Sequence, residues 1–169
     1  ITGNGAINFT NDAATLTTAT TGLTIGYDLN KDKKVVYADG AYKVVSKVYV
    51  AKIGEQGYES FAEALTAAEN DQTVELLWNE GDPAISMAGT VCGNKTVTIT
   101  GTAQVDWSKG WLYVGRNGEG NGKVIFNEAN LTSTEASLNN GTYGINVSMA
   151  EYGKSTTNDG EVVFKIAKI

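Results

Sequence analysis

The feature that most constrains the fold of this chain is a short strand-and-turn unit that occurs twice in its C-terminal third. Residues 121–126 have the sequence NGKVIF, and residues 159–164 have the related sequence DGEVVF. A looser echo relates residues 99–107 to residues 1–9. Near-copies of a strand and its turn are typical of stacked rungs, in which each rung buries its inward side chains against its neighbours. The sequence therefore predicts a short right-handed parallel β-helix.

The rest of the sequence also favours strands. Gly and Thr occur 20 times each and Asn 15 times, so these residues make up about a third of the chain and favour strands and turns over helices. Short runs rich in β-branched residues, separated by Gly and Asn turns, mark the expected strands. These strands cover residues 35–37, 42–45, 48–50, 73–77, 96–100, 111–114, 123–126, 143–148 and 162–166. We expect an all-β chain.

One segment has helical spacing. Over residues 60–69 the apolar side chains recur at intervals of three and four, which places them on one face of a helix. These apolar residues are Phe61, Ala64, Leu65 and Ala68. Ser60 and Glu63 have the spacing of a capping box, which predicts where the helix begins. Because the helix precedes the rungs, we expect it to cover one open end of the β-helix.

A domain boundary is expected near residues 46–52. Residues 1–46 contain a predicted hairpin closed by residues 38–40, and we interpret them as the closing segment of a preceding module or as accessory strands. Residues 47–169 form the predicted β-helix module with its capping helix. The turn-rich opening without a signal peptide leads us to expect an excerpt from a longer precursor.

The distribution of charge argues against two classes of partner. The net charge is −6, the lysines are scattered, and Arg116 is the single arginine. Nucleic acids and anionic membrane surfaces select clustered cations, so neither is an expected partner. No apolar run reaches the roughly 20 residues of a membrane span, so membrane insertion is not expected either.

The residue types of common active sites are scarce. Histidine is absent from the sequence, which excludes Ser-His-Asp and Cys-His catalysis and disfavours a catalytic zinc site. Cys92 is the single cysteine, and its apolar neighbours predict a small buried side chain rather than a reactive thiol. The glycine-rich residues 115–122 lead into another strand rather than a helix, so we interpret them as a turn and not as a phosphate loop. We expect no enzymatic activity, no metal and no cofactor.

Several residues around the capping helix form a recognisable module start. They are Val50 to Gly54, Tyr58, Phe61, Glu63, Ala64 and Thr73 to Leu77, preceded by residues 22–25 and 35–45. With these residues, the segment 20–80 resembles tandem β-helix modules in large surface or secreted proteins of gut-dwelling Firmicutes and related bacteria, some of them adhesin-like. The resemblance implies an extracellular or bacterial cell-surface location and a monomeric module within a longer chain.

A second resemblance implies a partner. Residues 97–149 are similar to modules of commensal immunoglobulin-binding superantigens. This similarity implies recognition of a host protein, namely the framework of an antibody variable domain. A glycan is the alternative partner, because related β-helix folds include polysaccharide-binding and lyase modules. A third hypothesis is a structural spacer that binds nothing.

The strongest positive signal for binding is aromatic. In residues 106–114, strand alternation places Leu112 and Val114 on one face and Trp111 and Tyr113 on the other. The aliphatic pair is expected to face the core. Trp111 and Tyr113 then stand on the outer wall of the β-helix.

Trp107 and Arg116 complete the candidate binding surface, which we define as Trp107, Trp111, Tyr113 and Arg116. These residue types are enriched at binding hot spots. The alternative is that Trp107 and one partner pack under a loop at residues 127–142.

Carboxylates could support sugar chemistry in place of binding, because glycoside hydrolysis needs only two acids at a suitable separation. The acidic residues among the rungs are Asp106, Glu119, Glu128 and Asp159. They form no tight cluster in the sequence, and a lyase would also need a basic residue beside a calcium cluster. The sequence therefore favours binding over catalysis.

Overall fold

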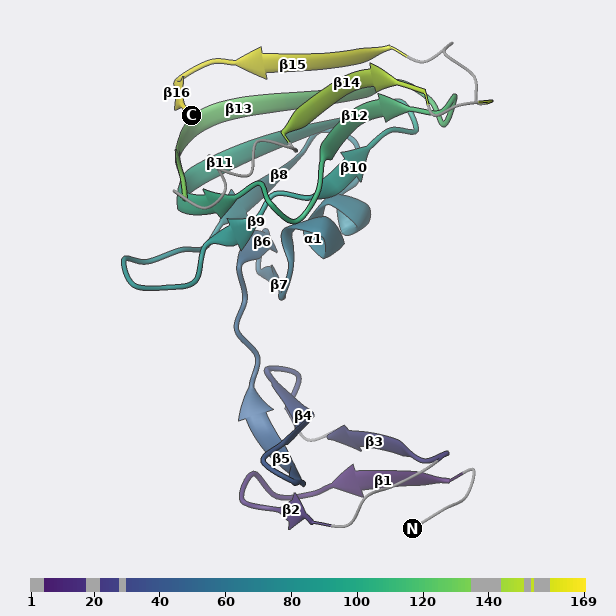
Figure 1. Ribbon diagram of the computed structural model, residues 1–169, viewed down its shortest axis with the longest axis vertical. Coiled ribbons are helices and arrows are strands. Elements are labelled where there is room, and N and C mark those ends of the chain that lie inside the picture. Colours follow the sequence, from purple (N-terminus) through teal and green to yellow (C-terminus); the bar gives the residue numbers. More distant parts are fainter. Residues whose placement is uncertain (1–4, 18–21, 28–29, 135–143, 151–152, 154–158) are drawn as a thin grey trace. The chain divides into compact units, whose positions relative to one another are not determined.

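The computed structural model describes residues 5–17, 22–27, 30–134, 144–150, 153 and 159–169. The chain divides into two compact units, Ile1–Val48 and Tyr49–Ile169. Most of the described residues lie in strands and one short helix is present, which confirms the all-β class (Figure 1). The division falls two residues after the expected end of the N-terminal segment at residue 46.

The N-terminal unit combines a parallel strand pair with an antiparallel hairpin. The parallel pair is β1 (Ala6–Phe9) with β3 (Thr24–Tyr27). The hairpin is β4 (Lys33–Ala38) with β5 (Ala41–Ser46), and β2 (Thr15–Leu16) pairs with β5 on its other side. Asp39 and Gly40 form its two-residue turn with φ of 52° and 77°, which is the left-handed conformation that a type I′ hairpin turn requires.

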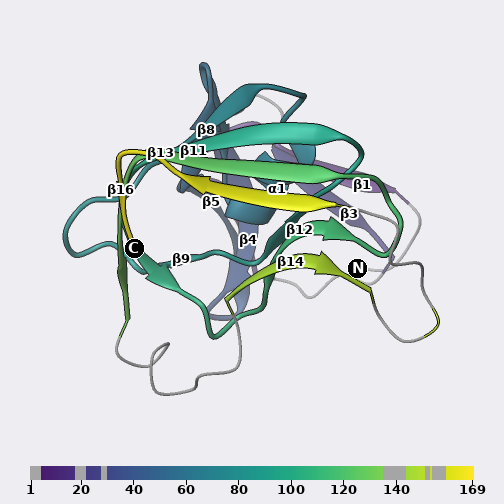
Figure 2. The ribbon, with the colours of Figure 1, turned by 90° about the horizontal axis from the view of Figure 1, so that it is seen from above.

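The C-terminal unit contains parallel strands that lie in separate rows. Figure 2 shows the first row with its strands side by side and β12 and β14 in another row. The first row consists of β8 (Gln72–Leu76), β11 (Lys95–Asp106), β13 (Gly122–Ser133) and β15 (Gly160–Phe164). The second row consists of β10 (Gly89–Val91), β12 (Leu112–Arg116) and β14 (Ile145–Met149).

The repeat in the sequence is also the pairing register of two neighbouring strands. In the β13–β15 pair, Gly122 lies opposite Gly160, Val124 opposite Val162, and Phe126 opposite Phe164. The rings of Phe126 and Phe164 stack with centroids 5.3 Å apart and planes inclined by 11°. Equivalent residues of the two sequence copies therefore lie directly above one another.

The two longest strands bend in the middle. The β11–β13 register shifts between Ile99 and Gly101, and Glu128 of β13 has a φ of 53°, which is the geometry of a β-bulge. After the bend, β9 (Ile85–Ser86) pairs with β11, and β16 (Ala167–Lys168) pairs with β13. The expected loop at residues 127–142 is therefore wrong over residues 127–133, because these residues continue β13 in register with β11. Residues 135–143 lie outside the described residues.

The expected strand at residues 48–50 is also wrong. The strand at this point is β6 (Ala51–Ile53), which pairs antiparallel with β7 (Gln56–Tyr58) and with β8. Val48 is 70% exposed, so its β-branched side chain has no core to pack against, and the apolar composition of this run was misleading.

The helix α1 (Phe61–Ala67) lies next to β6 and β7. The capping box is confirmed: Glu63 N donates to Ser60 Oγ over 3.2 Å, and Ser60 N donates to Glu63 Oε2 over 3.1 Å. The helix ends two residues before the expected residue 69. Lys95 Nζ donates to the carbonyls of Leu65 and Ala68 over 2.8 and 3.0 Å, so a distant side chain caps the last turn.

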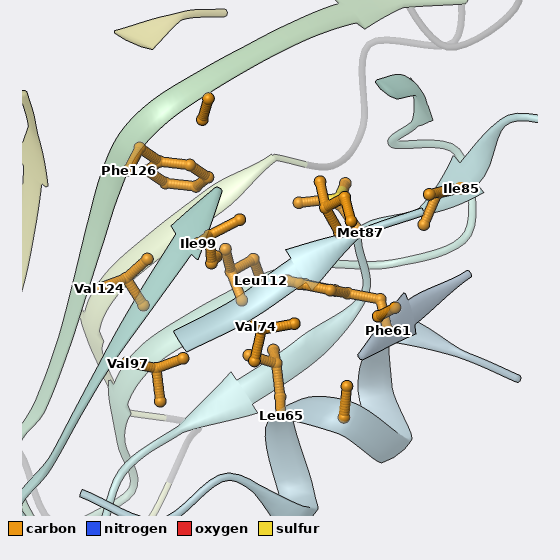
Figure 3. Close-up of a cluster of buried hydrophobic side chains, with 14 of the residues drawn as sticks. Phe61, Leu65, Val74, Ile85, Met87, Val97, Ile99, Leu112, Val124 and Phe126 are labelled. Carbon is orange, nitrogen blue, oxygen red and sulfur yellow. The ribbon is translucent and has the colours of Figure 1, made fainter. Parts of the chain in front are cut away.

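Apolar side chains from both rows and from α1 meet in one cluster (Figure 3). Val74, Ile99 and Phe126 are register partners in the first row, and all three are fully buried. Phe61 of α1 and Leu112 of β12 lie in the same cluster. Burial of each such side chain stabilises the fold by about 1.5–3 kcal/mol. The cluster therefore holds the two rows of strands and α1 together.

Candidate functional site

The strand β12 carries the centre of the candidate binding surface. Leu112 and Val114 are fully buried, which confirms that the aliphatic side chains face the core. Tyr113 alternates with them and is half-buried on the opposite face. Its register partners there are Thr90 of β10 and Asn146 of β14, so the tyrosine stands in the middle of the outer face of the second row.

Arg116 lies against Tyr113. Its Cζ atom is 3.9 Å from the centroid of the Tyr113 ring, the geometry of a cation–π contact worth about 0.5–1 kcal/mol at an exposed site. Gly115 makes the contact possible, because its φ of 68° breaks the alternation between residues 113 and 116. A side chain cannot replace this glycine: a Cβ atom would lie 2.7 Å from the carbonyl oxygen of Asp159.

The two tryptophans have different surroundings. Trp111 is half-buried directly before β12, and its carbonyl accepts a hydrogen bond from Gly89 N over 3.0 Å. Trp107 is also half-buried and packs against the buried cluster. The structure thus brings Tyr113 and Arg116 into contact, leaves Trp111 half-buried, and packs Trp107 at the edge of the core.

The acidic residues that the sequence analysis singled out take part in local contacts. Ser108 N donates to Asp106 Oδ1 over 2.8 Å, and the hydrogen bonds from the Ser108 side chain and backbone lower the pKa of Asp106. Glu128 occupies the bulge of β13 and lines a hollow of about 480 Å³ together with Ile166 and Lys168. Within the described ranges, no group of three acidic, cysteine or histidine residues is arranged to hold a metal ion.

Cys92 is half-buried rather than fully buried, which corrects the expectation from its apolar neighbours. Its Sγ atom lies 3.6 Å from Glu119 Oε2. Burial, with a smaller contribution from the Glu119 carboxylate, raises the pKa of the Cys92 thiol. The thiol is therefore protonated at neutral pH and is a poor nucleophile.

Sequence reasoning missed a row of asparagines, which we call the asparagine ladder: Asn70, Asn94 and Asn121. Each side-chain oxygen accepts a backbone N–H from the next turn of chain. The donors are Thr96 N at 2.9 Å, Asn121 N at 3.2 Å and Asp159 N at 2.8 Å. The 27-residue separation of Asn94 from Asn121 was the signal that could have revealed the ladder.

Comparison with protein-family models, with curated protein sequences and with solved structures finds no match to this chain. The function is therefore inferred from this chain's own residues. In the described part of the chain, no helix has the length and apolar character needed to cross a membrane.

Proposed function

We propose that residues 49–169 form a short right-handed parallel β-helix that acts as a non-catalytic binding module. The parallel pairing in both rows supports this fold, as does the order of the strands, in which each later strand adds to the outside of its row. The asparagine ladder supports it further, because each rung is hydrogen-bonded to the next at the same corner. Right-handed crossovers are the rule between parallel strands.

The partner in this proposal is an extracellular protein, and it binds the outer face of the second row around Tyr113. The observation that carries the proposal is the contact between Arg116 and the Tyr113 ring on a strand that is paired on both sides. Tyr, Trp and Arg dominate binding hot spots because they combine a large apolar area with a polar group. A pair that is already ordered before binding loses less conformational entropy when the partner arrives.

The partner to test first is an immunoglobulin variable domain, the partner implied by the resemblance that the sequence pattern of residues 97–149 suggested. The same similarity supports an extracellular or bacterial cell-surface location. Arg116 adds a constraint: its guanidinium is a cation that only donates hydrogen bonds, so contacts to it would come from acidic or carbonyl groups of the partner.

The test is binding of immobilised immunoglobulin Fab fragments, measured by biolayer interferometry. We expect the double variant Tyr113→Ala with Arg116→Ala to bind at least tenfold more weakly, which corresponds to about 1.4 kcal/mol. The matched control is Tyr37→Ala with Lys43→Ala, which removes an exposed tyrosine and a lysine from the N-terminal hairpin. The control should bind like the unaltered protein.

Two results would contradict the proposal. One is a double variant with an unchanged circular dichroism spectrum that binds Fab as tightly as the unaltered protein. The other is binding to a polysaccharide array that depends on Tyr113 and Arg116, without any binding to Fab. That second result would replace the protein partner by a glycan.

A further inference from the structure

The end of the C-terminal unit formed by β14, β15 and β16, which we call the β14–β16 end, exposes large apolar side chains. Phe164 is 54% exposed, Ile166 70% and Val147 43%. β14 and β15 are the last strands of their rows, and among the described residues no strand pairs with their outer edges. Unpaired edges with apolar side chains are templates for the addition of another strand.

The N-terminal unit has a strand with the same sequence pattern as β15. Residues 5–9 have the sequence GAINF, which matches GEVVF at residues 160–164 and GKVIF at residues 122–126 in its glycine, its central aliphatic residue and its final phenylalanine. β1 pairs with β3 on one side only, and in the described residues its other edge has no partner strand. The two strands with an open edge, β15 and β1, therefore share one sequence pattern.

The glycines of this pattern have a specific steric role in the C-terminal unit. A Cβ atom on Gly122 would lie 2.0 Å from the carbonyl oxygen of Val91, and one on Gly160 would lie 2.0 Å from that of Val114. Val91, Val114 and Val147 are successive register partners in the second row. The next glycine in the series would therefore lie against the carbonyl oxygen of Val147.

Among the described residues of its own unit, Gly5 meets no such close backbone contact. The nearest atom to a Cβ added at Gly5 is Leu23 Cδ2 at 3.8 Å, which is ordinary van der Waals contact, and no left-handed φ is found there. Glycine weakens a strand relative to alanine unless a close backbone approach requires it. No close backbone approach to Gly5 is thus found among the described residues of the N-terminal unit, whereas the repeat pattern predicts one at the β14–β16 end.

We propose that the β14–β16 end of one copy binds β1 of a second copy of this chain, which replaces the expected monomer by a head-to-tail assembly. β15 and β1 pair in parallel, with Gly160 opposite Gly5, Val162 opposite Ile7, and Phe164 opposite Phe9. The parallel pairing would continue across the interface. In the second copy β3 pairs in parallel with β1, just as β15 pairs in parallel with β13. The interface joins two different surfaces, so it repeats from copy to copy.

The assembly goes beyond the proposed function and does not depend on it. It uses the strand edges of the β14–β16 end, whereas the proposed binding face is the outer side of β12. Each added copy would bring a further Tyr113–Arg116 pair, and several linked pairs bind a multivalent partner with higher avidity than one pair.

The test is sedimentation velocity of the full chain over a range of concentrations. We expect reversible association in the unaltered protein and at least a tenfold weaker association in Gly5→Ala, whose added methyl group would meet the Val147 carbonyl. Phe164→Glu should weaken association to a similar extent from the other side. The matched control is Val48→Glu, because Val48 is as exposed as Ile166 but lies outside the proposed interface.

Mixing the two variants gives the sharpest result. Gly5→Ala keeps an intact β14–β16 end and Phe164→Glu keeps an intact β1, so the mixture should form a heterodimer that neither variant forms alone. Gly5→Ala changes no contact of the buried cluster, so this variant is expected to fold. The test therefore remains decisive even if Phe164→Glu folds poorly. A protein that is monomeric at all concentrations, association unchanged by Gly5→Ala, or a mixture without heterodimers would overturn the proposal.

Discussion

The two ends of the C-terminal unit are closed in different ways. At one end α1 covers the first strands, with Phe61 1% exposed and Leu65 fully buried. At the other end Phe164 is 54% exposed and stacks on one face only, against Phe126. A row of paired strands has an unpaired edge at each end. The difference shows that a local helix covers one end, whereas the other end exposes apolar side chains among the described residues.

The largest effect that tests this comparison is the loss of one phenyl ring at each end. Phe61→Ala should lower the free energy of unfolding by about 3–5 kcal/mol, because a buried aromatic side chain leaves a cavity. Phe164→Ala should cost about 1 kcal/mol or less, because half of its ring is already in water. Urea unfolding of both variants, at a concentration where the protein is monomeric, measures the difference. Equal losses would show that the two ends are equally closed.

A methyl group added at a glycine of the repeated sequence pattern should have the next largest effect on the free energy of unfolding. Gly160→Ala should lower the free energy of unfolding by at least about 1–3 kcal/mol, because the new Cβ atom overlaps the Val114 carbonyl and forces the backbone to move. Gly5→Ala in the same monomeric conditions should change stability by less than about 1 kcal/mol. Thermal unfolding of the pair checks this contrast, and a large loss in Gly5→Ala would mean that Gly5 has a close contact inside its own unit.

The closed end also depends on a charged contact. Lys95→Met should lower the free energy of unfolding by about 1–2 kcal/mol, because the carbonyls of Leu65 and Ala68 lose their donor. The matched control is Lys123→Met on the neighbouring rung, where Lys123 forms only an exposed ion pair with Glu161 at 2.9 Å. That variant should lose at most about 0.5 kcal/mol. Similar losses in urea unfolding would contradict the capping role of Lys95.

The smallest effect concerns the turn after β10, where Cys92 contacts Glu119. The pKa of the Cys92 thiol is higher in the folded protein than in the unfolded chain. The protonated thiol therefore stabilises the fold at pH values below the unfolded pKa. This stabilisation is lost as the pH rises through the folded pKa. Alkylation by iodoacetamide at pH 8 to 9 should therefore be slower in the folded than in the urea-unfolded chain. Glu119→Gln should speed the folded reaction modestly, and equal rates for folded and unfolded protein would refute the shift.

The parts of the fold that the sequence predicted depend on local patterns. The capping box of Ser60 and Glu63 and the inward alternation of Leu112 and Val114 need only neighbours in the chain. The register of β13 with β15 was visible because the repeat places like residues opposite each other.

The parts that the sequence did not predict depend on distant contacts. The helix ends at Ala67 because the backbone of Ala68 leaves helical geometry, and Lys95, 30 residues after Leu65, donates to its last carbonyls. The bulge at Glu128 needs a left-handed φ in a residue type that rarely adopts it, so the composition of residues 127–133 indicated a loop. Trp107 packs against the buried cluster, and strand alternation alone could not separate it from Trp111.

The most direct test of the closed and open ends is amide hydrogen exchange followed by NMR, residue by residue, at low and high protein concentration. At low concentration we predict strong protection in β8, β11 and α1 and weaker protection in β14 and β15. At high concentration protection should rise together in β15 and β1 and stay unchanged in α1. Equal protection at both ends in the monomer, or a β15 whose exchange is independent of concentration, would contradict the account.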